Sequence, residues 1–438
     1  MIDVFKNIVK IEELRKRILY TLMMLIVFRI GAHIPIPGID SKALASFFNA
    51  NSSGLLGHLD MFSGGALRNM TIFALGIMPY ISASIIMQLL TAVFPVLERL
   101  SREGEAGRKK ITQYTRYGTI VLGIIQGFGI AVGLESMGGL DGSKVVLAGM
   151  NTWAFRFTTV VTLTAGTAFI MWVGEQISER GIGNGISLII FAGIITGIPS
   201  AIVQTIALMD TGDITLFVIL LVGIIIVGVI GVVIYFETAN RKIPVQYARR
   251  TQGKKTFGGQ FSHLPLKINA SGVIPPIFAS SILAFPATIT GFTTIGWVQD
   301  IGNNLVPGRL LYNVVFVILI FFFCFFYTAI QYNPMKIAEE MKRYGGFIPG
   351  IRPGKKTADY LNLVLTRLTF GGAFYLSLIC VLPSILYVYF KVPFSFGGTA
   401  VLIVVGVALD TILQVETFLL NQNYDGFIRK SKKRKRHY

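Results

Sequence analysis

Charged residues are scarce in this chain of 438 residues. Only 14% of the residues are Asp, Glu, Lys or Arg, and 53% are hydrophobic. Soluble domains carry about 25% charged residues, so lipid must replace water around much of this chain. Apolar runs of about 20 residues recur along its length, which is the length that crosses a bilayer as a helix. The composition therefore predicts one integral membrane domain rather than two or three soluble ones.

Cysteine and histidine are also rare, and neither forms a reactive pattern. Cys324 and Cys380 lie inside apolar runs without a CxxC spacing, and the four histidines are scattered singly without an HExxH pair. A metal centre requires a cluster of such ligands. The spans also lack a Ser/His pair or paired aspartates. We therefore expect neither an enzyme nor a bound cofactor.

Ten apolar segments are each long enough to cross a bilayer. In hydrocarbon, only a helix or a closed barrel satisfies the backbone hydrogen bonds, and these runs lack the two-residue alternation of barrel strands. We therefore predict an all-helical protein with spans at residues 18–36, 71–92, 117–135, 153–173, 186–206, 215–236, 270–290, 310–330, 368–389 and 399–420. The first apolar run leads into residues 34–38, Ile-Pro-Ile-Pro-Gly, rather than an Ala-x-Ala site, so we expect a retained helix.

Basic residues are distributed unequally between the two sides of this topology. One side, which includes both termini, holds 33 of the 40 Lys and Arg residues, and the other side holds five. The remaining two, Arg29 and Arg156, lie within predicted spans. The positive-inside rule places both termini in the cytoplasm. Each basic residue near the membrane surface also gains about 1 kcal/mol of interaction free energy with anionic lipid headgroups.

The spans divide into two halves, residues 1–206 and 215–420, followed by a basic tail at residues 421–438. A Gly-x-x-Pro occurs at matching places in the halves, at 76–79 and 272–275. Five spans per half is an odd number, so the halves are predicted to be inverted relative to each other, with a central site at their interface.

Two long connections on the cytoplasmic side, residues 237–269 and 331–367, are basic. A channel for small solutes has no evident need of such length, so we interpret them as docking surfaces for a large partner. Residues 243–248 predict a strand, residues 249–255 a basic turn, and the residues after them a returning strand. The tip is suited to phosphate contacts with ribosomal RNA.

Three shorter segments interrupt the helical pattern. Residues 55–67 are apolar but too short to cross, a pattern that suits a re-entrant segment and equally an ordinary external loop. Such a segment persists at membrane depth only where protein covers it or where it lines a wet cavity. Residues 180–185 are rich in glycine but lack the Lys-Ser/Thr of a phosphate-binding loop, so they predict a tight turn. Glycines at 127–133 predict close helix packing.

Ionisable groups within the spans are few, and the ones that matter for transport are Arg29, Arg156 near a helix start, and Asp410. Ion-coupled transporters place carboxylates or basic relays near the membrane midplane. Their scarcity here counts against such a function. A secondary transporter of a small solute nevertheless stays open as the alternative, because Asp410 lies in the tenth span.

Four motifs carry a resemblance to a known family. Residues 61–67, 73–86, 174–187 and 347–354 resemble the SecY family, the pore-forming subunits of bacterial Sec translocases. The resemblance implies a clamshell of two inverted five-helix halves around an hourglass pore in the bacterial inner membrane. It also implies a channel that passes unfolded secretory proteins and releases transmembrane helices sideways into the bilayer.

The same resemblance assigns roles to individual residues. A plug at about residues 55–69 would close the outer funnel, and a ring of isoleucines would close the pore itself. The plug residues are Leu59, Met61, Phe62, Ser63, Gly64, Gly65 and Leu67, and the pore ring is Ile77, Ile81, Ile186, Ile190, Ile277 and Ile403. The lateral gate toward lipid is Ser82, Ile85, Ile86, Gln88, Pro275, Ile277 and Ser281. The motor and ribosome contacts are Arg249, Arg250, Lys254, Lys255 and Arg352.

The implied partners follow from the same family. They are the SecE and SecG subunits, the SecA ATPase, the translating ribosome, signal peptides and unfolded clients, anionic lipids, and the YidC and SecDF proteins. SecA, the ribosome or the proton motive force would supply the energy. Isoleucines at a constriction exclude water and ions without gripping a passing chain, as hydrophobic gates do. A signal sequence would partition between channel and lipid by its hydrophobicity.

Overall fold

The computed structural model describes residues 11–40, 44, 60, 63–136, 145–147, 151–211, 215–247, 250–252, 255–257, 261–290, 304, 309–390 and 398–434. Helices dominate these residues, and each predicted span contains one. The ten matching helices are α2 (Glu12–Gly31), α5 (Met78–Val93), α7 (Glu105–Ser136), α8 (Thr152–Arg180), α9 (Gly185–Asp210), α10 (Leu216–Thr238), α11 (Ile274–Thr290), α13 (Leu310–Gln331), α15 (Lys355–Phe390) and α16 (Gly398–Arg434).

Most of these helices are long and apolar enough to span a bilayer. Within the described residues, seven helices are long and apolar enough to cross a membrane, and an eighth is added if α5 and the short helix α6 (Pro95–Arg102) count as one bent span. The break between α5 and α6 bends the chain by 100°. Helix α2 carries charges in its first turns and α11 is short, so neither meets the same test. The protein is a multi-pass membrane protein.

The predicted end of the first span and the predicted start of the second were wrong. Helix α2 ends at Gly31 rather than 36, and α5 begins at Met78 rather than 71. The residues between pair with each other instead: the Ile36 amide donates to the Met70 carbonyl at 3.0 Å, and the Ile72 amide donates to the Ile34 carbonyl at 3.0 Å. Hydropathy alone cannot separate this apolar, non-helical pairing from a buried helix.

The irregular stretch before α5 packs its backbone against α8. A methyl group added at Gly166 of α8 would overlap the carbonyl oxygen of Ile72. Gly76 has a φ of 55°, a left-handed conformation that favours glycine, and Pro79 lies in the first turn of α5. The helix therefore starts only after this turn.

Other helices begin earlier than hydropathy predicts. Helix α7 begins at Glu105 rather than 117, and α15 begins at Lys355 rather than 368. The added turns are polar, as shown by the exposed pair of Lys109 with Glu105. Apolar content marks only the part of a helix that lies in lipid, whereas the helix itself continues beyond it.

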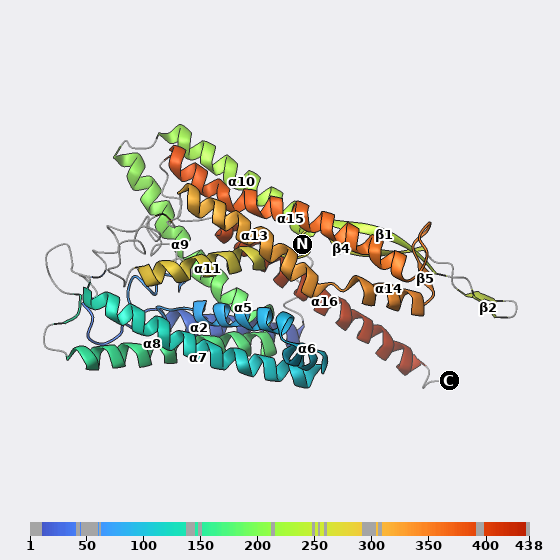
Figure 1. Ribbon diagram of the computed structural model, residues 1–438, viewed down its shortest axis with the longest axis horizontal. Helices are drawn as coiled ribbons and strands as arrows, with labels where there is room; N and C mark the ends of the chain where they lie inside the picture. Colours follow the sequence, from blue (N-terminus) through green and yellow to red (C-terminus); the bar gives the residue numbers. More distant parts are fainter. Residues whose placement is uncertain are drawn as a thin grey trace.

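The N-terminal and C-terminal helices form separate groups. Figure 1 shows α2, α5, α7 and α8 together along one side and α10, α13 and α15 along the other, with α11 between them. Helix α11 contacts both α5 and α13, and α9 contacts both α8 and α16. The predicted close helix packing is present, since a Cβ added at Gly127 of α7 would lie only 3.6 Å from the Val160 Cα of α8.

A small sheet projects from one end of the helices. Strands β1 (Asn240–Tyr247) and β4 (Phe261–Lys267) pair antiparallel, and β5 (Gly346–Phe347) joins the other edge of β1 to give the order β4-β1-β5. The short strands β2 (Arg250–Gln252) and β3 (Lys255–Phe257) form a hairpin beyond them. The predicted strand and returning strand are present as β1 and β4, but Arg250–Gln252, predicted as part of the basic turn, form the strand β2 instead.

The third strand of this sheet was not predicted, and it joins the two long basic connections. Helix α14 (Pro334–Arg343) and β5 come from the second connection, and β1 and β4 come from the first. Ile243, Leu266 and Ile348 pack in one small core with residues of α15. We call the end of the molecule that carries this sheet and α14 the basic end (Figure 1).

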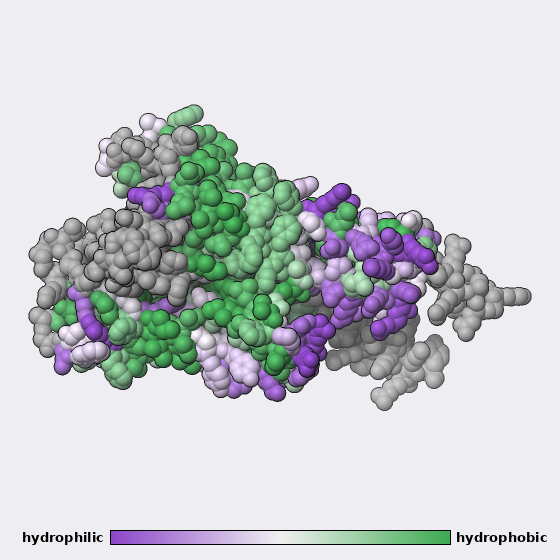
Figure 2. Space-filling view, in the orientation of Figure 1, coloured by the Kyte–Doolittle hydropathy of each residue, from purple (hydrophilic) through white to green (hydrophobic). Residues whose placement is uncertain are grey.

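The surface is apolar over the helices and hydrophilic at the basic end. Figure 2 shows hydrophobic residues across the middle of the molecule and hydrophilic residues gathered around α14 and the sheet. Large apolar side chains on α13 and α15 are exposed, among them Leu310, Ile318, Phe370 and Phe374. Exposed apolar surface of this extent requires lipid or protein rather than water against it.

Candidate functional site

The six isoleucines predicted as the pore ring belong to one hydrophobic cluster, although they come from four separated parts of the chain. Five are buried with no more than 8% of their surface exposed, and Ile186 is partly buried against the same cluster. The cluster is built from α5 and the residue before it, α9, α11 and α16. The buried residues are Ile77, Ile81, Ile190, Ile277 and Ile403.

Local sequence places two of the isoleucines from α5. Ile77 immediately precedes the helix, and Pro79 in its first turn has no amide hydrogen that needs a partner there. The Ile81 amide donates to the Ile77 carbonyl at 3.0 Å, so the two side chains lie one turn apart.

The glycine-rich turn before α9 places two more. Helix α8 ends at Arg180 and α9 begins at Gly185, as the predicted tight turn requires. The Asn184 side chain accepts hydrogen bonds from the amides of Ile186 and Ser187 and so caps α9. Ile186 and Ile190 are four residues apart and therefore share one face of the helix.

Two further contacts hold this turn against other helices. The Gly183 amide donates to the Gln414 side chain of α16 at 2.9 Å, and the Ile182 amide donates to the Thr21 hydroxyl of α2 at 3.1 Å. Gly183 has a φ of 87°, which favours glycine. The turn thus ties α9 to the first and last helices, and these contacts were not anticipated from the sequence.

The side chains of this cluster are suited to excluding water and ions rather than to catalysis or metal binding. Its members are aliphatic and aromatic side chains together with Cys324 and Cys380, whose thiols are free and buried. No group of three or more His, Cys, Asp or Glu that could hold a metal occurs among the described residues. Aliphatic and aromatic side chains of this kind exclude water and ions and offer almost no directed hydrogen bonds.

The plug-like segment, residues 55–69, is described at Asp60 and from Ser63 onward. Ser63 and Leu67 are buried, and the Leu67 amide donates to the Ser63 hydroxyl at 3.1 Å. The Asp60 carboxylate accepts from the Arg68 amide at 2.7 Å. Gly64 and Gly65 have φ values of 68° and 83°. The predicted residues Leu59, Met61 and Phe62 lie outside the described residues.

The predicted lateral gate lies at the packing of α5 against α11. The Ser281 hydroxyl of α11 lies 3.9 Å from the Met78 sulfur of α5. Ile85, Pro275, Ile277 and Ser281 are buried, Ser82 and Gln88 are partly buried, and Ile86 is 46% exposed. The Gln88 amide donates to the Ser84 hydroxyl on its own helix. The two helices meet without a salt bridge among the described residues.

The predicted motor and ribosome residues lie at the basic end where they are described. Arg352 is exposed in the turn before α15, between Gly350 and Gly354, whose φ values are 81° and 103°. Arg250 and Lys255 lie in the β2–β3 hairpin. The remaining two, Arg249 and Lys254, lie outside the described residues.

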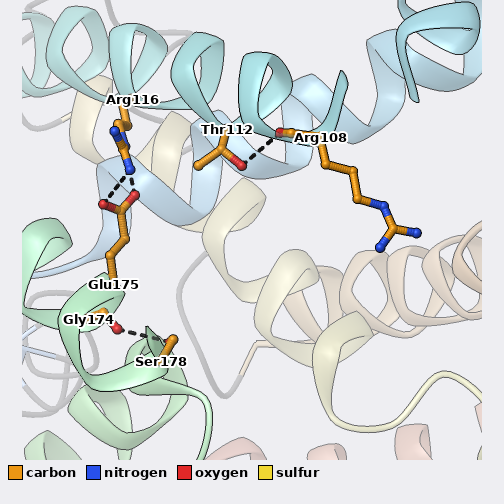
Figure 3. Close-up of polar contacts among 6 residues, drawn as sticks. All are labelled: Arg108, Thr112, Arg116, Gly174, Glu175 and Ser178. Atoms are coloured by element: carbon orange, nitrogen blue, oxygen red, sulfur yellow. Dashed lines mark hydrogen bonds and ion pairs between the residues drawn. The ribbon is translucent and has the colours of Figure 1, made fainter. Parts of the chain in front are cut away.

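Two bidentate ion pairs clamp α7 to α8, one near each end of the helix pair. Arg116 donates to both oxygens of Glu175 at 2.8 Å, and Arg156 donates to both oxygens of Glu135 at 2.6–3.2 Å. Figure 3 shows the Arg116–Glu175 pair near Ser178, which donates to the Gly174 carbonyl. The sequence analysis missed both pairs. Opposite charges near the ends of consecutive spans were their signal.

Fold and site together define a mostly helical, multi-pass membrane protein with a large buried apolar cluster. The fold is similar to a solved structure described as a protein-conducting channel, with a TM-score of 0.64 and 18% identity over 92% of each chain. It is also similar to Sec61 in the canine ribosome-channel complex from the endoplasmic reticulum, with a TM-score of 0.61 and 17% identity over 92% of each chain.

Comparison with known sequences identifies the family of this chain. The family model SecY matches residues 71–412. The protein translocase subunit SecY of Pseudomonas aeruginosa is 50% identical over 425 residues, 96% of this chain and 94% of the relative. The subunit of the same name from Escherichia coli is 51% identical over 423 residues, 96% of this chain and 95% of the relative. The chain belongs to the SecY family.

Proposed function

We propose that this protein is the channel subunit of a Sec translocon, which passes unfolded proteins across the membrane and releases transmembrane helices sideways into the bilayer. The observation that carries the proposal is the convergence of six isoleucines from four parts of the chain into one buried cluster. For a related SecY structure, the plug domain is described as stabilising the closed state of the channel and maintaining a membrane seal.

The proposed mechanism needs no bond-making step in this chain. In the resting channel, the isoleucine ring excludes water, and the plug-like segment covers it. An extended polypeptide displaces the plug and separates the isoleucines, which make no directed hydrogen bonds and therefore accept side chains of different size. We propose that the chain is not itself an enzyme and that a partner supplies the energy.

Ten spans in two inverted halves, residues 1–206 and 215–420, complete this proposal. The ten helices at the predicted positions support it, as does the position of α11 beside α5. Such a plan allows one half to move against the other, so that an apolar helix enters lipid between α5 and α11. Proximity of Asp410 to a transport site would favour the small-solute alternative, but Asp410 is exposed on α16, and the matched relatives are named translocase subunits.

We place the protein in the bacterial inner membrane with its basic end in the cytoplasm. The supporting observation is the unequal charge distribution, since 33 of the 40 Lys and Arg residues lie on the side that carries both termini and the sheet. The positive-inside rule assigns that side to the cytoplasm. The sheet and α14 then face the compartment in which ribosomes and ATP are present.

Partners are proposed on the same basis. Two structural neighbours are ribosome-bound channels: Sec61 in the canine complex and the yeast Ssh1 complex on the 80S ribosome. The β2–β3 hairpin, beyond the sheet at the basic end, is the proposed ribosome contact. SecE and SecG would complete the channel, SecA would drive it, and anionic lipids would surround its basic end, with YidC and SecDF as further partners.

The test of the proposed function is reconstitution. Vesicles containing this protein with SecE are supplied with SecA, ATP and a secretory precursor, and protease is then added outside. We expect ATP-dependent protection of the precursor. Vesicles with SecE alone serve as the control. Protection that is equal in both preparations, or that fails to appear with ATP, would contradict the function.

Arg352 offers a sharper test of the basic end. Replacing Arg352 with Glu is expected to lower SecA-driven translocation by roughly tenfold, the equivalent of about 1.4 kcal/mol of lost interaction. The side chain is exposed, so its charge is available to a partner, and a surface substitution of this kind changes stability by only about 0.5 kcal/mol. The measurement is the initial rate of precursor protection at fixed SecA.

Lys342→Glu in α14 is the matched control for Arg352, because it reverses a basic charge at the same end. An equal loss in both variants would assign the effect to general electrostatics rather than to the Arg352 turn.

A further inference from the structure

Arg29 is a cation within the first predicted span, and it reaches the plug-like segment. It lies near the end of α2, where its Nη1 atom donates to the carbonyl oxygen of Gly64 at 3.0 Å. The same atom lies 3.3 Å from the hydroxyl of Thr196 on α9. The Thr196 hydroxyl in turn donates to the Gly193 carbonyl at 2.7 Å. One guanidinium thus joins α2, α9 and the plug-like segment.

Gly64 lies unusually close to the same part of α9. A Cβ atom at Gly64 would lie 2.9 Å from the Gly193 Cα and 3.2 Å from Arg29 Nη1. Gly64 also has a φ of 68°, which a residue with a side chain rarely adopts. Because Gly64 and Gly193 have no side chains, the backbone of the plug-like segment lies close to α9. The Gly64 carbonyl oxygen can therefore accept a hydrogen bond from the Arg29 guanidinium.

A hydrogen bond from a cation to a carbonyl is stronger than a neutral one, because the donor is ionised. At membrane depth, few other acceptors compete for it, and an arginine in a span is costly unless it pairs with backbone carbonyls or faces water. Arg29 is partly buried next to Phe28, which is 2% exposed. When the plug-like segment leaves, Arg29 loses this acceptor.

We propose that Arg29 is the positioning residue that holds the plug-like segment on α9 in the closed channel, and that breaking its bond to the Gly64 carbonyl is part of opening. The proposal rests on the proposed channel function. In this proposal, Arg29 stabilises the closed channel relative to the open one, whereas the isoleucine ring blocks the passage of water and ions. A weaker bond should therefore shift the equilibrium between closed and open states and leave the open channel unchanged.

The test compares Arg29→Gln, Arg29→Lys and Thr196→Val with Arg309→Gln. Arg309 donates to Asn304 beside α13 and is the control for loss of an arginine. Each variant also carries Leu67→Cys, a plug position that is 7% exposed. The rate of labelling of this thiol by a membrane-impermeant maleimide reports the fraction of channels with the plug displaced. The unsubstituted chain, whose Cys324 and Cys380 are buried, gives the background.

We expect Arg29→Gln to raise both the labelling rate and the resting ion conductance roughly tenfold, which corresponds to about 1.4 kcal/mol. Arg29→Lys keeps the charge without the planar fork, so its increase should be smaller. Thr196→Val removes the second acceptor of Arg29, together with the bond from the Thr196 hydroxyl to the Gly193 carbonyl, but leaves the bond to Gly64, so it should rank lowest of the three. Precursors with a weakened signal sequence should pass better through Arg29→Gln, whereas the rate for an intact signal at saturating SecA and ATP should not change.

Equal labelling in Arg29→Gln and Arg309→Gln would overturn the proposal. So would a loss of translocation in Arg29→Gln for intact and weakened signals alike, because that pattern indicates a folding role. If Arg29→Gln does not insert, the labelling rates of Arg29→Lys and Thr196→Val decide, and rates at the control level overturn the proposal. Labelling needs no translocation, so failure of the precursor assay in the unsubstituted channel would count against the proposed function alone.

Discussion

Replacing Ile81 and Ile403 together with serine is expected to make the resting channel conduct ions. Both side chains are buried in the shared cluster, at 5% and 0% exposed, and they come from α5 and α16, which are far apart in the sequence. Each isoleucine contributes about 1.5–3 kcal/mol by leaving water, and a serine hydroxyl at the same place attracts water instead. The conductance of reconstituted vesicles or planar bilayers should rise by a factor of about ten or more.

The matched control for the ring is Ile86→Ser on the same helix as Ile81. Ile86 is 46% exposed, so the substitution changes the same chemistry away from the cluster. We expect its conductance to equal that of the unsubstituted channel. Protection of a secretory precursor should persist in the double variant, since a wider constriction still admits an extended chain. If the double variant still translocates and its resting ion conductance does not rise, the proposal that these isoleucines line the pore is wrong.

Most of the helical framework could be predicted from the sequence. Long apolar runs leave few alternatives in lipid, and for this reason a helix occurs in each of the ten predicted segments. The strand that begins near residue 243 and the returning strand were also predictable from residue type, whereas the strand β2 within the predicted turn was not. The ends of helices were not, because residues 71–77 are mostly apolar yet form turns, and Thr71 and Ile72 pair with Pro35 and Ile34.

Contacts between distant parts of the chain could not be predicted from the sequence pattern. Nothing in the sequence pairs Arg29 with the Gly64 carbonyl, because a backbone acceptor leaves no residue signal. The two-residue strand β5 is too short to show a period, and it is defined only by its partner β1. The six isoleucines resemble many others in apolar spans, and only the family motifs selected them. That they share a cluster required the folded chain.

Cross-linking α5 to α11 is expected to abolish translocation. The change is a cysteine pair at Met78 and Ser281, whose side chains approach to 3.9 Å. If a polypeptide and its signal helix pass between these helices, a short thiol cross-linker that joins them holds the channel closed. ATP-dependent precursor protection should fall to the background, and a reducible cross-linker should allow recovery after reduction. The measurement is protection before cross-linking, after it and after reduction.

The control pair for the gate joins two helices of the same group. Cysteines at Gly123 of α7 and Thr164 of α8 are suitable, because a Cβ at Gly123 would lie 3.6 Å from the Thr164 methyl carbon. Helices α7 and α8 are already held by two bidentate ion pairs, so a covalent link between them adds a constraint that the resting structure already satisfies. Translocation should therefore continue at its normal rate. A channel that works equally well with α5 and α11 joined would have to open elsewhere, and the gate between these helices would then be rejected while the isoleucine ring stays testable through its conductance.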